Sequence, residues 1–315
     1  MSNVIRLIRH YHGQNGQGTV YIMKKLPFLV IFAMTVLLFG GPQPGYAAVT
    51  WQWLLSLKGQ TSSGHSMRMP SALYCDQAHE RYYVVDTGNN RLLSFNKDGK
   101  FIKEFDAGGQ LQSPFDMVKD REGHIWLIEK GRNSLTMIDL ENKAVENHSL
   151  SYHGLTVFPN RLEYKDNIFY VLDKATGQVL KLDQDLKVTG RFASRGAMGF
   201  VDFKIRNGLL WALQRDAKAV LSFAMDGKPA SSVVLEDVVR FPCSLEVGPS
   251  GIFYILDRHE GDVVVFDKKG RFRYRFLTPG QAQGRLYFPI ELKFDPWGRL
   301  CIVEEGNGRV EVFAR

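Results

Sequence analysis

The chain has 315 residues, of which 44% are hydrophobic and 12% aromatic, enough to bury a full core in one large domain. Its formal net charge of +7 is concentrated at the start, because residues 1–47 carry four basic residues and no acidic ones. The remainder has 36 basic and 33 acidic residues, too even a balance for the dense basic face of a nucleic-acid binder, so no nucleic acid is expected as a partner.

The first element in chain order is a targeting segment. Lysines at 24–25 precede 14 mostly apolar residues, 26–39, and the small residues Gly45 and Ala47 suit cleavage after position 47. This layout predicts a signal peptide over 23–47, because the apolar run is shorter than the ~20 residues that usually span a bilayer. We therefore expect a secreted or periplasmic protein. The alternative is an uncleaved signal that anchors the chain, which would be its sole contact with a membrane.

Residues 1–22 lie upstream of this signal and show no periodicity. They are polar and rich in Gly and Gln. We interpret them as an upstream extension, with translation starting at Met23.

An internal repeat organises the rest of the chain, 49–315. Six similar units start 44, 45, 41, 42 and 47 residues apart, at Pro70, Pro114, Pro159, Phe200, Pro242 and Pro289. Each of the first five units contains four short runs rich in β-branched and aromatic residues, separated by turns of which several contain Gly. A period in the forties with four strands per unit is typical of a β-propeller blade.

The last unit ends after three strands, at Arg315. The run TWQWLLSLKG, residues 50–59, resembles the missing fourth strand. We therefore predict an all-β, six-bladed propeller of four-stranded antiparallel blades, closed by the N-terminal strand, which completes the last blade. Closure of this kind leaves no long free sheet edge.

The units resemble NHL repeats. The likeness is carried by YYVVDTGNNRLLSFNKDGKFIKEF in the first unit and by EEGNGRVEVF in the last. It implies the propeller fold but leaves the function open, because NHL propellers include protein-binding, RNA-binding and sensor domains and an amidating lyase with metals in its ring. The fourth unit departs most from the pattern, since it lacks the initial proline and has Gln214 where the other units have an acidic residue.

Two rings of polar residues follow from the repeat. The first ring consists of the residue that ends the second strand of each unit. Because a similar residue recurs there, we expect it to have a structural role in the adjoining turn. The second lies two residues after each unit start, where propellers line their central channel. It comprises Ala72, Asp116, Arg161, Asp202, Ser244 and Glu291. These residues vary from unit to unit, so we consider all but Ala72 as candidate binding residues.

A second candidate site is formed by loops at one end of the propeller, which we call the entry face. These loops precede the first strand of a unit or join its second and third strands, and loops often carry functional residues. The candidate residues on them are Arg91, Arg132, His153, Arg215, Arg258, His259 and Arg309.

We predict a non-catalytic binding module for a protein, peptide or glycan, without a cofactor, because no nucleophile elbow, phosphate loop or EF-hand motif is present. The alternative is a lyase or lactonase with Ca²⁺ or Zn²⁺ at the ring centre, as in gluconolactonase-type propellers. Asp116, Asp202 and Glu291 would then be oxygen ligands, and His153 or His259 the acid–base group.

The three cysteines, Cys75, Cys243 and Cys301, form no CxxC pair and lie in apolar runs, so we expect small buried side chains. A bridge between Cys75 and Cys301 on neighbouring blades is the alternative.

Overall fold

The computed structural model describes residues 50–59, 66–194 and 199–315. The predicted extension and signal peptide lie outside these residues. Within the described part of the chain, no helix is long and apolar enough to cross a membrane.

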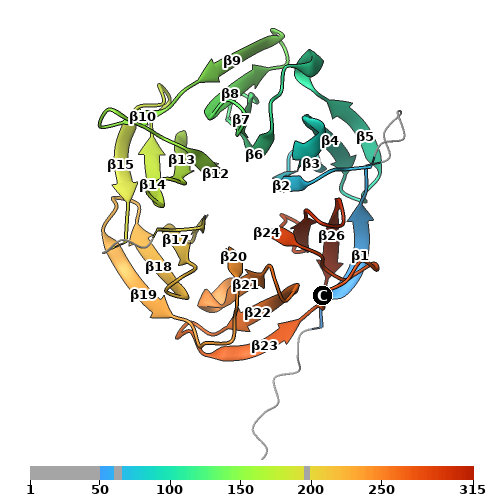
Figure 1. Ribbon diagram of the computed structural model, residues 1–315, viewed down its shortest axis with the longest axis vertical. Coiled ribbons are helices and arrows are strands. Elements are labelled where there is room, and N and C mark those ends of the chain that lie inside the picture. The colour runs from blue at the N-terminus through green and yellow to red at the C-terminus, as the bar shows by residue number, and fades with distance from the viewer. Residues whose placement is uncertain (1–49, 60–65, 195–198) are drawn as a thin grey trace, which may run out of the picture. The chain divides into compact units, whose positions relative to one another are not determined.

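Six four-stranded antiparallel sheets stand around a central axis, as predicted (Figure 1). From the channel outward, the first three blades are β2 (Pro70–Asp76), β3 (Arg81–Asp86), β4 (Arg91–Asn96) and β5 (Phe101–Phe105); β6 (Pro114–Lys119), β7 (Ile125–Glu129), β8 (Ser134–Asp139) and β9 (Ala144–His148); and β12 (Pro159–Lys165), β13 (Ile168–Asp173), β14 (Gln178–Leu182) and β15 (Val188–Phe192).

The other three blades are β16 (Asp202–Arg206), β17 (Leu209–Gln214), β18 (Ala219–Ala224) and β19 (Pro229–Val234); β20 (Pro242–Val247), β21 (Phe253–Asp257), β22 (Asp262–Phe266) and β23 (Phe272–Phe276); and β24 (Pro289–Phe294), β25 (Leu300–Glu304), β26 (Arg309–Ala314) and β1 (Gln52–Leu57). A two-stranded hairpin, β10 (Ser151–Tyr152) and β11 (Leu155–Thr156), lies between blades 2 and 3 and was not predicted.

The proline at the start of a blade shapes the strand that lines the channel. In the five blades that begin with proline, the pairing of the first two strands shifts register directly after that residue, as between Pro159 and Arg161. Blade 4, which lacks the proline, pairs without a shift from Asp202 onward. Proline has no N–H to donate to a ladder, so the start of a strand or a bulge is where it fits.

The N-terminal strand closes the ring, as predicted. β1 pairs antiparallel with β26, from Gln52 opposite Ala314 to Leu57 opposite Val310. Leu57 is fully buried among side chains of blades 1 and 6. The buried carboxylate of Glu311 accepts hydrogen bonds from Trp53 Nε1 at 2.8 Å and Ser56 Oγ at 2.5 Å, so polar contacts also hold the closing strand.

The hydrophobic core lies between neighbouring blades. The Trp126 ring on β7 packs 4.8 Å from that of Phe169 on β13, in a cluster drawn from blades 2 and 3. Cys75, Cys243 and Cys301 are free thiols, and Cys75 and Cys301 share one cluster between blades 1 and 6. Apolar side chains therefore fill the space between the blades, whereas polar side chains of the inner strands line the channel.

Candidate binding site at the mouth of the central channel

The acidic residues that end the second strands are anchors for loops. Asp86 accepts the backbone N–H of Arg68 at 2.7 Å, and Asp257 accepts that of Arg240 at 2.6 Å. Both acceptors are fully buried, and in each case the donor lies in the loop that precedes the same blade. The prediction placed such bonds in the following turn; Asp257 also makes that bond, from His259 N at 3.1 Å. These carboxylates are therefore committed to the scaffold.

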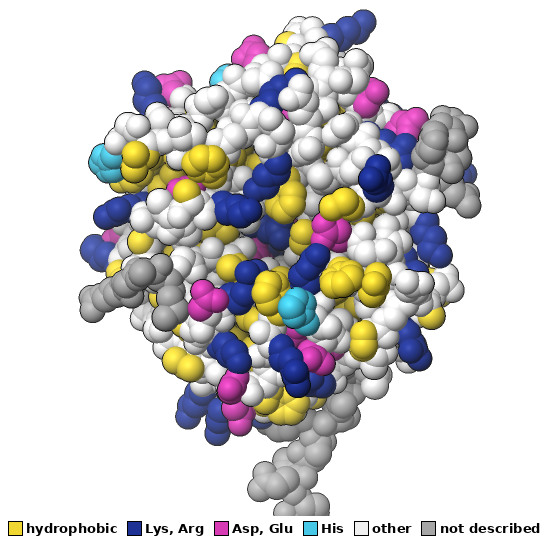
Figure 2. Space-filling view, viewed as in Figure 1, with side chains coloured by type: hydrophobic (Ala, Val, Ile, Leu, Met, Phe, Trp, Pro, Cys, Tyr) yellow, Lys and Arg dark blue, Asp and Glu magenta, His cyan; other side chains and the backbone are white. Residues whose placement is uncertain are grey.

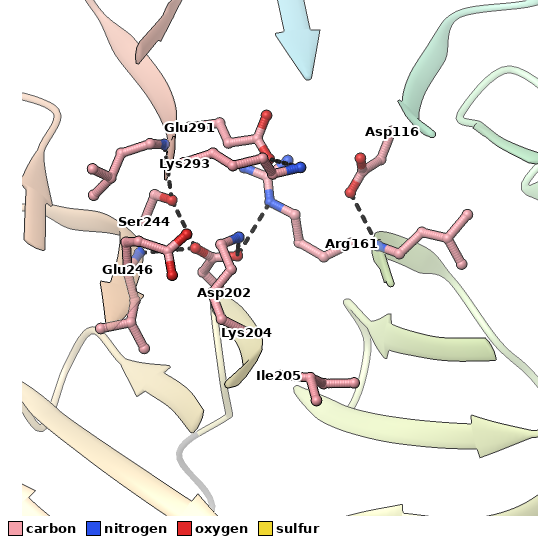
Figure 3. Close-up of polar contacts among 12 residues, drawn as sticks. Asp116, Arg161, Asp202, Lys204, Ile205, Ser244, Glu246, Glu291 and Lys293 are labelled. Atoms are coloured by element: carbon pink, nitrogen blue, oxygen red, sulfur yellow. Dashed lines mark hydrogen bonds and ion pairs between the residues drawn. The ribbon is translucent and has the colours of Figure 1, made fainter. Parts of the chain in front are cut away.

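The second predicted ring surrounds the channel (Figure 3). Its four members that carry a side-chain oxygen each accept a backbone N–H from the next blade. Asp116 accepts from Leu162 at 3.0 Å, and Asp202 accepts from Leu245 at 2.8 Å. Ser244 and Glu291 do the same for the N–H groups of Leu292 at 3.1 Å and Leu73 at 2.8 Å.

Lysines two residues further along the inner strands neutralise these acids. Lys204 Nζ lies 3.3 Å from Asp202 Oδ1, and Lys293 Nζ lies 3.3 Å from Glu291 Oε1. Sequence reasoning missed both lysines and the buried Glu246 on β20. The period-2 alternation of a strand could have found them, because positions two apart on an inner strand face the same side.

Arg161 crosses the channel. Its side chain starts on blade 3, and the guanidinium Nη2 donates to the carbonyl of Ile290 on blade 6 at 3.1 Å. Nε lies 3.7 Å from Asp202 Oδ1, an ion pair without a hydrogen bond. Among the described residues, neither Nε nor Nη1 has a hydrogen-bond acceptor, although the residue is only 5% exposed. Burial alone would lower the pKa of Arg161, but Asp202, Asp116 and Glu291 outweigh it, so the pKa is raised and the charge is kept.

Above Arg161, cations and aromatic rings alternate around the mouth of the channel. Figure 2 shows basic and hydrophobic side chains gathered at the centre of this face. In four of the six blades, the side chain of the residue after the end of the second strand donates to the carbonyl of the proline that begins the next blade. Lys130 Nζ donates to Pro159 O at 2.9 Å, and Arg215 Nε donates to Pro242 O at 3.0 Å.

The same cations lie over aromatic rings. Lys130 Nζ is 4.5 Å from the centroid of the Phe115 ring, and the guanidinium carbon of Arg161 is 5.3 Å from that centroid. The guanidinium of Arg215 is 4.1 Å from the ring of Phe241, and that of Arg258 is 5.4 Å from the ring of Phe288. We call this set of cations and rings the mouth rim; it also contains Phe158 and Lys174.

The predicted entry-face residues divide into two groups. Arg91 and Arg309 are buried and paired with Asp86 and Glu304, and Arg132 pairs with Glu129, so these three support their own blades. Arg215, Arg258 and His259 lie at the mouth rim, where the His259 ring stacks 4.4 Å from that of Phe241. His153 lies on the turn between β10 and β11, at the outer side of the ring (Figure 1).

Comparison with known proteins supports the class of fold. No family model and no curated protein matches the chain, so the likeness to NHL repeats stays a prediction. Many solved structures match. They include a gluconolactonase from Xanthomonas campestris (19% identity, 82% of this chain and 88% of that one, TM-score 0.63) and virginiamycin B lyase from Staphylococcus aureus in complex with quinupristin (14%, 78% and 80%, 0.58).

A calcium-binding regucalcin from Agrobacterium tumefaciens also matches, at 12% identity over 79% of this chain and 90% of that one, with a TM-score of 0.60. At such identities the likeness shows the fold alone. The protein is a six-bladed β-propeller whose structural neighbours include lyases, a gluconolactonase and a calcium-binding protein.

The channel carboxylates do not fit the metal that such neighbours suggest. Both oxygens of Asp116 accept backbone N–H groups, from Met117 at 2.8 Å and Leu162 at 3.0 Å. Burial and the charge of Glu291 raise the pKa of Asp116 to about 6. The oxygens of Asp202 and Glu291 are taken by N–H, hydroxyl and lysine donors. These three carboxylates are not among the described side chains whose ligand atoms lie within 4.8 Å of one another, as a hard cation requires. Arg161, Lys204 and Lys293 also place positive charge where the cation would lie.

Among the residues that the structure describes, one group of three metal-type side chains has its ligand atoms within 4.8 Å of one another: Asp120, Glu122 and His124. It lies on the turn between β6 and β7, at the opposite end of the strands from the mouth rim. His124 Nδ1 is hydrogen-bonded to Asp120 Oδ2 at 2.9 Å, which occupies the carboxylate.

The charge of Lys130 makes a pH dependence testable. Burial, followed by the charges of Lys174 and Arg161, lowers the pKa of Lys130 to about 8 from the ordinary 10.5, with Asp116 acting in the opposite sense. Between about pH 8 and 10.5 the unfolded chain therefore binds more protons here than the folded one, so this group adds stability as the pH rises. Relative to Lys130→Met, the wild type should gain free energy of unfolding across this range.

Urea unfolding of both proteins at pH 7.5 and pH 10 measures the effect, and Lys187→Met, on the opposite face, gives the reference trend. An identical pH trend for wild type and Lys130→Met would contradict the assigned pKa.

Proposed function

We propose that the protein is a secreted or periplasmic binding module without a catalytic centre, which recognises a protein, peptide or glycan through its entry face. The mouth rim carries this proposal. It joins exposed apolar surface, with Phe158 47% and Phe288 42% exposed, to the cations Lys174, Arg215 and Arg258. Aromatic and arginine side chains are the ones most enriched where proteins bind partners.

The charge at the rim indicates an acidic partner. The channel acids beneath it are neutralised by Arg161, Lys204 and Lys293, so they do not offset the rim cations. Of the acids at the rim, Glu305 pairs with Arg258. Lys174 is exposed to solvent. Complementary charge steers encounter and suppresses wrong partners, and it makes binding sensitive to salt.

The binding test uses arrays of acidic and neutral peptides and glycans. The wild type should be retained by acidic members, and retention should fall as salt is raised. The variant Phe158→Ser with Phe288→Ser should lose at least about tenfold in affinity, since each exposed ring buries on binding and truncation of such anchors costs more than 1 kcal/mol. Lys187→Ala should bind as the wild type does.

The result that overturns the proposal is equal retention of wild type and the double variant on every array member. Turnover of lactones or streptogramins that is abolished by a chelator would favour the alternative, a metal-dependent lyase or lactonase. The likeness to solved structures supports that alternative, and the committed state of the channel carboxylates opposes it.

A further inference from the structure

Two buried donors of Arg161, Nε and Nη1, have no hydrogen-bond acceptor among the described residues, and the scaffold does not explain them. A guanidinium has five N–H donors, and here Nη2 bonds the Ile290 carbonyl while Nη1 and Nε meet no acceptor in the described part of the chain. A buried donor without an acceptor costs folding free energy, and the cost is greater when the donor is charged. The cost disappears when an acceptor arrives from outside.

The charges around these two donors favour an anion as the missing acceptor. Lys130 shares the Phe115 ring with Arg161, and burial, followed by the charges of Lys174 and Arg161, lowers the pKa of Lys130. Lys130 Nζ is bound to Pro159 O and to Asn160 Oδ1 at 2.7 Å, so it is held beside the guanidinium. Lys130 and the exposed Lys174 therefore add positive charge beside Arg161, whose own charge is balanced by the channel acids.

The position of Arg161 also fixes what lies next to the anion. The side chain begins three residues after Phe158 on blade 3 and ends on the carbonyl two residues after Phe288 on blade 6. Both of these rings are exposed. The guanidinium therefore lies between the inner ends of two loops that each present an apolar ring.

We propose that Arg161 is the anion subsite of the entry face and that it binds the carboxylate of a ligand that also carries an apolar group. Nη1 donates to one carboxylate oxygen, Lys130 and Lys174 supply charge beside it, and the apolar group contacts Phe158 or Phe288. A hydrogen bond from a guanidinium to a carboxylate is charge-assisted and therefore stronger than one between neutral groups. This subsite deepens the proposed function and rests on the entry face being the binding face.

In the test, the protein is titrated with N-acetylphenylalanine and, separately, with its amide, and binding is monitored by calorimetry and by NMR chemical shifts. The acid should bind at least about tenfold more tightly than the amide, because the charge-assisted hydrogen bonds are worth more than 1.4 kcal/mol. In Arg161→Lys, and more weakly in the exposed Lys174→Gln, this preference for the acid should shrink. Lys187→Gln should keep it in full.

Three outcomes would overturn the subsite. The first is equal binding of the acid and the amide, and the second is an unchanged preference for the acid in Arg161→Lys and Lys174→Gln, both shown to be folded by their melting curves. The third is tighter binding of phenyl phosphate than of the acid, which would assign the site to phosphate. Failure of the subsite is distinct from failure of the proposed function. If the arrays are bound through Phe158 and Phe288 while the preference for the acid is absent, the binding face stands without this subsite.

Discussion

Asp202→Asn should lower the free energy of unfolding by about 3–5 kcal/mol, the range observed when one member of a buried ion pair is removed. Asp202 is fully buried between Arg161 and Lys204, and it accepts hydrogen bonds from Ser244 Oγ at 2.7 Å and Leu245 N at 2.8 Å. Burial by itself raises the pKa of this carboxyl, but Lys204 and Arg161 outweigh burial and hold the pKa below its ordinary value.

The neutral amide keeps the shape of the side chain and removes the charge that balances two buried cations. Equilibrium unfolding in urea measures the loss. Asp226→Asn removes one member of an exposed pair with Lys228 and should leave the stability close to that of the wild type. Adding Arg161→Met to Asp202→Asn should restore part of the loss, because one of the uncompensated cations is then gone. A loss near that of the control would show that the channel charges are solvated rather than mutually balanced.

Trp51→Ala should cost about 3–5 kcal/mol, the usual range when a large aromatic side chain is removed from a core. Trp51 directly precedes the closing strand and is 9% exposed. Its ring stacks against Phe276 of blade 5 at 6.1 Å and Phe294 of blade 6 at 5.9 Å. The guanidinium of Arg315 lies 4.6 Å from the ring, so both ends of the described chain meet at this side chain.

Trp51→Phe provides the matched control. The indole N–H of Trp51 is buried without a hydrogen-bond partner among the described residues, and phenylalanine removes that donor while keeping an aromatic ring. We expect a cost clearly below that of Trp51→Ala, measured by the same urea titration. If both variants lost about the same stability, the indole would contribute through something other than its stacked apolar surface.

Much of the fold could be predicted from the sequence because the signals are local. A strand, a turn and an alternating run recur in six units, five of which begin with proline, and each is set by the preferences of the residues within it. Closure by residues 50–59 followed from counting strands. The hairpin of β10 and β11 was missed because its two-residue strands carry no periodic pattern.

The candidate site divides in the same way. Their shared position, two residues after the start of a unit, placed Asp116, Arg161, Asp202, Ser244 and Glu291 at the channel, where the structure also has them. Their role in binding stays a prediction. Sequence reasoning treated Arg91 and Arg309 as surface residues, whereas the structure buries both against acids that end second strands. A sequence gives a charged residue its type, but its partner comes from another strand.

The sequence by itself therefore determined the repeat, the blade count and the closure, since these depend on spacing and on preferences within a few residues. Only the tertiary structure decided which charges neutralise one another and which donor is left over. Arg161 meets Asp202 from the next blade and Ile290 from the opposite one. Those contacts span 41 and 129 positions of sequence and form only when the blades assemble around the channel, because hydrogen bonds and ion pairs depend on distances of a few ångströms that no local pattern specifies.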